Sequence, residues 1–129
     1  MIQPVQKSLF AVIGNPVGHS LSPVMMNRAF QSLQVPAVYV ALQVDRLEED
    51  LETLYRTGFE GLSVTLPHKE QALGIVEEAD ETARTIGAVN TLRRTPRGWE
   101  GRNTDWLGAN RALRAATPLE GKRVLVLEI

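Results

Sequence analysis

Lys69 and Asp105 are the two residues in this sequence whose types could together move a proton. Lys69 follows Ser63-Val64-Thr65-Leu66-Pro67, which predicts a short strand turning directly into a helix, because proline suits a first helical position. A cation in that first turn faces the positive end of the helix dipole, at a cost of about 0.3–1 kcal/mol. Such breaks of a local rule are where functional sites are sought. With a carboxylate across a crevice, the lysine could give a proton to a ketone and take it back from an alcohol.

Each residue also has a purely structural interpretation. Lys69 could point into water beside Glu70, and Asp105 could be a simple helix-start acid. The positions of other polar side chains favour chemistry, because the carboxyl ends of strands in an open α/β sheet share one crevice. Hydroxyls, an amide and a carboxylate occur at three further junctions, which are residues 18–23, 87–91 and 101–105.

Ser20 and Ser22 stand at a predicted helix start, just before Pro23. Free N–H groups and the dipole favour an anion at such a position, and two hydroxyls would add donors for a carboxylate. Ser22 is expected to be the N-cap, so Ser20 is the serine that capping does not explain. Thr65 and Asn90 could bind ligand hydroxyls, or they could equally satisfy local backbone groups.

The order of the predicted elements indicates an α/β fold. Nearly unbroken apolar runs predict buried strands at residues 8–14, 37–42 and 59–64. Amphipathic patterns predict helices that alternate with them, at residues 22–33 and 45–57. We therefore expect a three-layer αβα architecture with an open, mostly parallel sheet.

The second half of the chain is expected to add an antiparallel strand. Two short runs, at residues 88–92 and 99–102, flank a turn with proline and glycine and predict a hairpin. Thr104 is the expected N-cap of a last helix, whose buried side would hold Trp106, Ala109, Asn110 and Leu113. Residues 122–127 are again a buried-strand run.

Composition excludes several classes of function. With 129 residues, 43% hydrophobic and 22% charged, the chain is expected to be one globular domain. A net charge of −1 gives no electrostatic case for nucleic acid or an anionic membrane. There is no cysteine, and His19 and His68 are taken as bystanders without metal-ligand spacing. Neither a signal peptide nor a span of ~20 apolar residues is seen, so a cytoplasmic location is the default expectation.

Taken together, five motifs resemble the shikimate dehydrogenase family over the whole chain and in order. They are Gly14-Asn15-Pro16, Ser20-Leu21-Ser22-Pro23, Ser63-Val64-Thr65-Leu66-Pro67-His68-Lys69, Gly87-Ala88-Val89-Asn90-Thr91 and Asn103-Thr104-Asp105. The resemblance is to the N-terminal, substrate-binding and catalytic domain. It implies reversible NADPH-dependent reduction of 3-dehydroshikimate to shikimate, in aromatic amino acid biosynthesis.

The resemblance also implies residue roles. Ser20 and Ser22 would hold the substrate carboxylate, and Lys69 and Asp105 would be the catalytic pair. The remaining substrate contacts, to the ring hydroxyls, would come from Ser63, Thr65, Lys69, Asn90 and Asp105. Ser63 stands where family members usually have asparagine, so this contact keeps a hydrogen-bonding group but changes its length.

The end of the sequence departs from the family pattern. There the strand matching residues 124–127 opens a Rossmann domain and runs into a glycine-rich turn, whereas here Glu128-Ile129 follow. We expect residues 1–119 to be the substrate-binding domain and 120–129 the first strand of a truncated NADP-binding domain. The Rossmann cofactor domain would be missing, no NADP(H) would bind to this chain, and it would be inactive in isolation.

Two other interpretations remain open at this point. The chain could be a non-enzymatic module that binds shikimate or quinate, or the junction residues could only cap helices without any ligand. The sequence also leaves open the preference between shikimate and quinate, that between NADP and NAD, and a homodimer.

Overall fold

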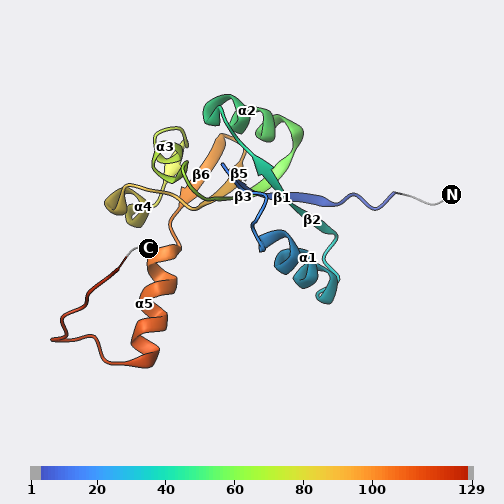
Figure 1. The fold of residues 1–129 in the computed structure, drawn as a ribbon. Coiled ribbons are helices and arrows are strands. Elements are labelled where there is room, and N and C mark those ends of the chain that lie inside the picture. Colours follow the sequence, from blue (N-terminus) through green and yellow to red (C-terminus); the bar gives the residue numbers. More distant parts are fainter. Residues whose placement is uncertain (1–3, 128–129) are drawn as a thin grey trace.

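A computed structural model describes residues 4–127, and within them six strands form one sheet (Figure 1). The strands are β1 (Ser8–Gly14), β2 (Ala37–Gln43), β3 (Phe59–Val64), β4 (Glu78–Ala79), β5 (Thr91–Thr95) and β6 (Gly98–Arg102). Their order across the sheet is β2-β1-β3-β5-β6-β4, which leaves β2 and β4 at the edges. Only β5 runs against its neighbours β3 and β6. The prediction of a mostly parallel sheet with at least one antiparallel strand is therefore confirmed.

The helices lie on both faces of this sheet. They are α1 (Ser22–Ser32), α2 (Leu47–Thr57), α3 (Lys69–Leu73), α4 (Glu81–Ile86) and α5 (Asp105–Ala116). Side chains of a strand alternate between its two faces. Accordingly, Ala11 and Ile13 of β1 face α2, whereas Val12 packs on the side of α1. This alternation explains why an unbroken apolar run predicted a strand that is buried on both faces.

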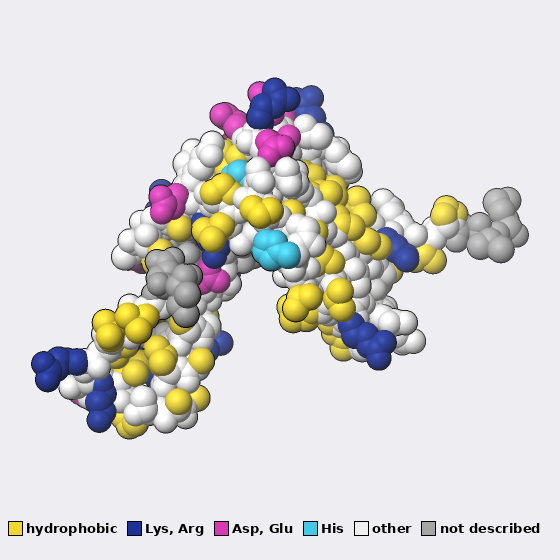
Figure 2. Space-filling view, viewed as in Figure 1, with side chains coloured by type: hydrophobic (Ala, Val, Ile, Leu, Met, Phe, Trp, Pro, Cys, Tyr) yellow, Lys and Arg dark blue, Asp and Glu magenta, His cyan; other side chains and the backbone are white. Residues whose placement is uncertain are grey.

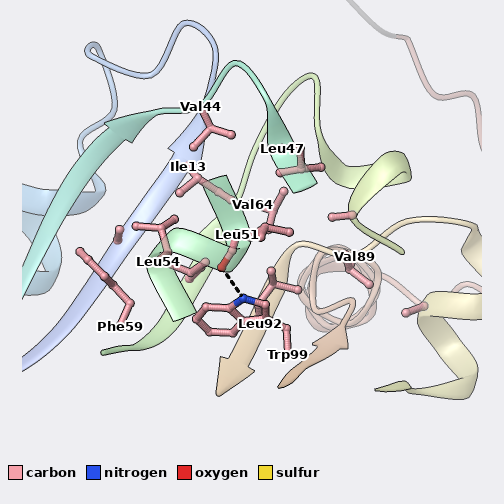
Figure 3. Close-up of a cluster of buried hydrophobic side chains, with 14 residues drawn as sticks. Ile13, Val44, Leu47, Leu51, Leu54, Phe59, Val64, Val89, Leu92 and Trp99 are labelled. Atoms are coloured by element: carbon pink, nitrogen blue, oxygen red, sulfur yellow. Dashed lines mark hydrogen bonds between the residues drawn. The ribbon is translucent and has the colours of Figure 1, made fainter. Parts of the chain in front are cut away.

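The main core lies between the sheet and helices α2, α3 and α4 (Figure 3). Its largest fully buried side chains are Ile13, Leu47, Leu51, Val89 and Leu92. The indole N–H of Trp99 donates to the Leu51 carbonyl at 3.1 Å, which ties β6 to α2. The core therefore fixes the strands whose ends carry the polar junctions.

The face covered by α1 has a smaller cluster. Val12, Val17 and Tyr39 are buried there, and Met26 and Phe30 of α1 pack against them. α1 itself has no buried residue, so this helix rests on the sheet by one side and remains largely exposed.

The last helix does not bury the side that its pattern predicted. Trp106 is 53% exposed and Leu113 is 45% exposed, because α5 projects away from the sheet (Figure 1). The expected burial of Trp106, Ala109, Asn110 and Leu113 is thus wrong for the chain that the structure describes. No other helix or strand within residues 4–127 covers this side.

The expected strand at residues 122–127 is also not formed. These residues have no strand partner among residues 4–127, and Val124 to Leu127 are 60–83% exposed. An apolar run becomes a strand only when a neighbour can pair with it. Glu128 and Ile129 lie outside the described residues, and the assignment of 120–129 to a second domain stays a prediction. Across the described part of the chain, no helix has the length and apolar character needed to cross a bilayer.

Candidate active site

One hollow, of about 470 Å³, lies at the carboxyl ends of β1 and β3 and beside the first residues of α1 and α5. All seven residues predicted from the sequence line it, namely Ser20, Ser22, Ser63, Thr65, Lys69, Asn90 and Asp105. The molecular surface is hollowed where α1 and α5 diverge, and hydrophobic side chains gather over both helices (Figure 2). Segments far apart in the sequence thus contribute to a single polar site.

Lys69 and Asp105 meet in this hollow. The Lys69 ammonium donates to Asp105 Oδ2 at 2.6 Å, although the residues are 36 positions apart. The expected first-turn position of Lys69 is confirmed, since α3 begins at this residue. Pro67, however, lies in the turn before α3 and not at its first position. The two side chains are 29% and 56% exposed, so the pair can be reached by a ligand.

Asp105 is held by more than the lysine. The Asn90 amide donates to Asp105 Oδ1 at 2.8 Å, so each carboxylate oxygen has its own donor. The side-chain oxygen Oδ1 of Asn103 accepts from the backbone N–H of Asp105 and of Trp106, at 3.1 and 3.4 Å. Thr104 occupies the predicted N-cap position of α5, but the capping hydrogen bonds come from the side chain of Asn103, one residue earlier. The capping role of Asn103 was not predicted, although asparagine caps helices as well as threonine does.

The hydrogen bond from Lys69 is the main cause that lowers the pKa of Asp105 below its ordinary 3.8. Partial burial opposes it, while the Asn90 hydrogen bond and the lysine charge add to it. A carboxylate with a depressed pKa stabilises the fold above its ordinary pKa and loses that contribution as the pH falls through the lower folded value.

This depressed pKa predicts how Asp105→Asn changes stability with pH. We expect the wild type to exceed the variant by up to about 1 kcal/mol at neutral pH, because the pair is largely exposed. The difference should begin to shrink as the pH falls below the ordinary pKa of 3.8 and should be lost as the pH falls through the lower pKa of the folded state. Thermal unfolding of both chains from neutral to acidic pH measures it. A difference that grows on acidification would contradict the assignment of the charge pair.

The two serines exchange their expected local roles. The Ser20 hydroxyl accepts from the Ser22 backbone N–H at 3.2 Å, and the residue before α1 is Leu21, which cannot cap with its side chain. The expectation that Ser22 is the N-cap is thus wrong, because Ser20 satisfies the free N–H instead. Among residues 4–127, no side chain or backbone group bonds the Ser22 hydroxyl, which leaves this serine available to a ligand in the hollow.

Asn90 is bonded mainly to its own surroundings. Its amide donates to the Thr104 hydroxyl at 2.9 Å as well as to Asp105, and its oxygen accepts from the Thr104 backbone N–H at 3.0 Å. Asn90 therefore positions the start of α5 even before any ligand is considered. Thr65 is placed by its backbone, which donates to the Ile13 carbonyl at 2.9 Å.

The histidines differ from one another. His68 is 5% exposed, and its Nε2 lies 2.7 Å from the Val44 carbonyl, so this nitrogen carries the proton and ties the α3 start to the end of β2. His19 is exposed and lines the hollow. Its place in the hollow follows from its position next to Ser20 in the same junction, and its role as a bystander stays a prediction.

The glycines at the end of β1 do not form a phosphate-binding loop. The sequence has neither G-x-G-x-x-G nor G-x-x-x-x-G-K-[ST]. Gly14, at the end of β1, serves a close approach instead, since a Cβ there would lie 2.4 Å from Thr65 Cγ2 and 3.0 Å from the Leu66 carbonyl oxygen. This glycine lets the β3 end pack beside β1 and places Thr65 at the hollow.

Gly14→Ala is accordingly expected to destabilise the chain by about 1–3 kcal/mol, because the added methyl must displace Thr65 or the backbone of Leu66. Gly18→Ala is the matched control, since a Cβ on Gly18 meets nothing within 4 Å. Urea unfolding of the two variants measures the difference. Equal stability of both variants would show that the β1 end tolerates a side chain.

A second hollow, of about 720 Å³, lies between α2 and the β5–β6 hairpin. The polar groups of its two aromatic side chains already have hydrogen-bond partners. The Tyr55 hydroxyl donates to the Thr95 carbonyl, and the Trp99 indole N–H donates to the Leu51 carbonyl. Its charged side chains are exposed glutamates and arginines of the helix and hairpin surfaces, such as Glu49 and Arg56. The smaller hollow with the Lys69–Asp105 pair is therefore the candidate active site.

Known proteins are similar to this chain over most of its length. A model of the family described as the shikimate dehydrogenase substrate binding domain matches residues 12–92. The shikimate dehydrogenase (NADP(+)) of Syntrophobacter fumaroxidans is 66% identical over 127 residues, which are 98% of this chain and 44% of that protein. The corresponding enzyme of Bacillus cereus is 46% identical over 125 residues, which are 94% of this chain and 45% of that protein.

Among solved structures, shikimate 5-dehydrogenase from Thermus thermophilus in complex with shikimate superimposes with a TM-score of 0.82 and 40% identity. The match covers 89% of this chain and 45% of that one. The chain thus spans less than half the length of the curated relatives that it matches.

Proposed function

The chain belongs to the family of shikimate dehydrogenase substrate-binding domains, and from this premise we propose that it binds shikimate and 3-dehydroshikimate for an NADP-dependent shikimate dehydrogenase. The observation that carries the proposal is the convergence of Lys69, Asp105 and several hydroxyls on one hollow. A small polyhydroxylated carboxylate matches such a lining in size and polarity. The proposal includes a cytoplasmic location and a metabolite, not nucleic acid, as partner.

Ser20 and Ser22 are proposed to hold the substrate carboxylate. They stand at the start of α1, where unpaired backbone N–H groups and the helix dipole favour an anion. The Ser20 hydroxyl accepts the Ser22 N–H and thereby orders the turn, and within residues 4–127 the protons of both hydroxyls remain available to a ligand. Ser63, Thr65, Asn90 and the charged pair would then contact the ring hydroxyls.

Lys69 is the proposed acid and base. When a ketone is reduced, its oxygen gains negative charge, and the Lys69 ammonium can donate the proton that neutralises it. In the reverse direction the Lys69 amine takes the proton of the alcohol. Asp105 keeps the ammonium in place through the 2.6 Å contact and accepts hydrogen bonds from Lys69 and Asn90. These roles concern the proton and the substrate, because the described residues do not form a dinucleotide site.

Titration calorimetry of the chain with shikimate tests this function. We expect one ligand per chain, and no measurable heat with cyclohexene-1-carboxylate, which has the carboxylate but lacks the hydroxyls. A parallel titration with quinate shows which of the two ring acids, shikimate or quinate, binds more tightly. Absence of shikimate binding would overturn the proposal, and equal binding of the ligand without hydroxyls would overturn the proposed role of the ring contacts. Sedimentation of the same sample decides whether the chain forms a homodimer.

Redox activity separates an enzyme from a binding module. We expect the chain alone not to oxidise NADPH with 3-dehydroshikimate, and to do so when joined to the remaining part of the Syntrophobacter fumaroxidans relative. Shikimate binding without turnover in that joined protein would favour the non-enzymatic module instead.

A further inference from the structure

Ser63 has a buried partner outside the candidate active site. The Tyr39 hydroxyl donates to Ser63 Oγ at 2.7 Å, and Tyr39 is only 5% exposed. Tyr39 lies on β2 and Ser63 on β3, with β1 between them, so the tyrosine side chain reaches across β1. Ser63 also borders a third hollow, of about 270 Å³, that Tyr39, Phe10 and Met26 line. The Ser63 hydroxyl therefore lies between the hydrophobic side chains of this small hollow and the hollow of the candidate active site.

The hydrogen-bond capacity of a serine hydroxyl limits what Ser63 can do. The group has one proton and two acceptor lone pairs. Its oxygen accepts from Tyr39, and within residues 4–127 its own proton has no acceptor, so the proton remains available on the side of the ligand hollow. Without the tyrosine, the hydroxyl could rotate among staggered positions.

We propose that Tyr39 is a positioning residue that fixes Ser63 as a hydrogen-bond donor to a ligand oxygen, an inference that rests on the proposed function of the hollow. Ser63 makes the ligand contact, and Tyr39 acts only through it.

The backbone of Tyr39 is held as firmly as its side chain. The Asn27 side chain accepts from the Tyr39 N–H at 2.9 Å and donates to the Tyr39 carbonyl at 2.7 Å. Asn27 lies on α1, the helix whose start carries Ser20 and Ser22. Burial raises the pKa of the Tyr39 hydroxyl, so the proton that it donates to Ser63 is present throughout the neutral range. Tyr39 therefore links the start of α1, which carries Ser20 and Ser22, to Ser63 on β3.

The second tyrosine of the chain gives a matched control. The Tyr55 hydroxyl also makes one hydrogen bond, of 2.6 Å, but to the Thr95 carbonyl on the opposite face of the sheet. Tyr39→Phe and Tyr55→Phe each remove one hydroxyl and one hydrogen bond while keeping the ring. Only the first removal should affect the ligand.

Calorimetric titration with shikimate tests the link to the ligand. We expect Tyr39→Phe to weaken binding about 2- to 10-fold, as for one neutral hydrogen bond, and Tyr55→Phe to leave it unchanged. In a Ser63→Ala background, Tyr39→Phe should cause no further loss, because the group through which it acts is gone. The inference is overturned if Tyr39→Phe binds as the wild type does, or if its loss is equally large without the serine hydroxyl.

A second measurement needs no ligand. Scalar couplings in NMR spectra should report one χ1 rotamer for Ser63 in the wild type and in Tyr55→Phe, and an average of rotamers in Tyr39→Phe. A single rotamer in all three chains would overturn the inference even if shikimate binds. Failure of the wild type to bind shikimate, with averaging seen only in Tyr39→Phe, would instead overturn the proposed function and leave the Tyr39–Ser63 link supported.

Discussion

Lys69→Met is expected to reduce turnover by about 10²–10⁴-fold in the chain joined to the remaining part of the Syntrophobacter fumaroxidans relative, the usual effect of losing a general acid. Methionine keeps the aliphatic stem, so the loss reports the ammonium and not the packing. Shikimate binding by the chain alone should weaken about 10- to 100-fold, because a hydrogen bond from a charged donor contributes about 1.5–3 kcal/mol. Stopped-flow or steady-state NADPH absorbance and calorimetry measure the two effects.

The stability of Lys69→Met should change by no more than about 1 kcal/mol. The Asp105 carboxylate that it leaves unpaired is 56% exposed and remains solvated. Lys7→Met is the control, since Lys7 is exposed and does not line the hollow. Turnover of Lys69→Met within a factor of about two of Lys7→Met would exclude the proposed acid.

Leu51→Ala is expected to have the largest effect on stability, a loss of about 2–5 kcal/mol. Leu51 is 1% exposed in the main core, so truncation leaves a cavity beneath β1 and β3 and beside Trp99. Urea unfolding followed by tryptophan fluorescence measures the loss. Because total stabilities of such domains are about 5–15 kcal/mol, the variant should still fold at low temperature.

Leu33→Ala is the control for this core substitution. Leu33 follows α1 and is 73% exposed, so its truncation should change the free energy of unfolding by less than about 0.5 kcal/mol. Similar losses in the two variants would mean that the apolar cluster beneath α2 does not carry the stability of the chain.

The strands that could be predicted from the sequence are those whose residues follow one unambiguous pattern. The apolar run at residues 8–14 predicted β1, and the turn with proline and glycine predicted the hairpin of β5 and β6. β4 could not be predicted, because its two residues, Glu78–Ala79, are too short for any periodicity. The exposure of the apolar side of α5 could not be predicted for another reason. An amphipathic pattern shows which side of a helix is apolar but not what lies against it.

The candidate active site was predicted at the level of residue types, and its contacts were not. Strand ends converge in any open α/β sheet, so Lys69 and Asp105 could be expected to meet. Which serine caps α1, and that Asn103 caps α5, depends on backbone directions within one turn. The Tyr39–Ser63 bond joins strands separated by β1, and no spacing along the chain encodes such a contact.

The Asn27 contacts to Tyr39 also affect the tendency of the protein to aggregate through its edge strand. β2 is an outer strand, and the outward N–H and C=O of Tyr39 are already engaged by the asparagine. A strand that ends a sheet normally offers such groups as a template for another chain, which is a common route to aggregates. By engaging them with a side chain, α1 blocks the pairing of another strand with β2 at Tyr39.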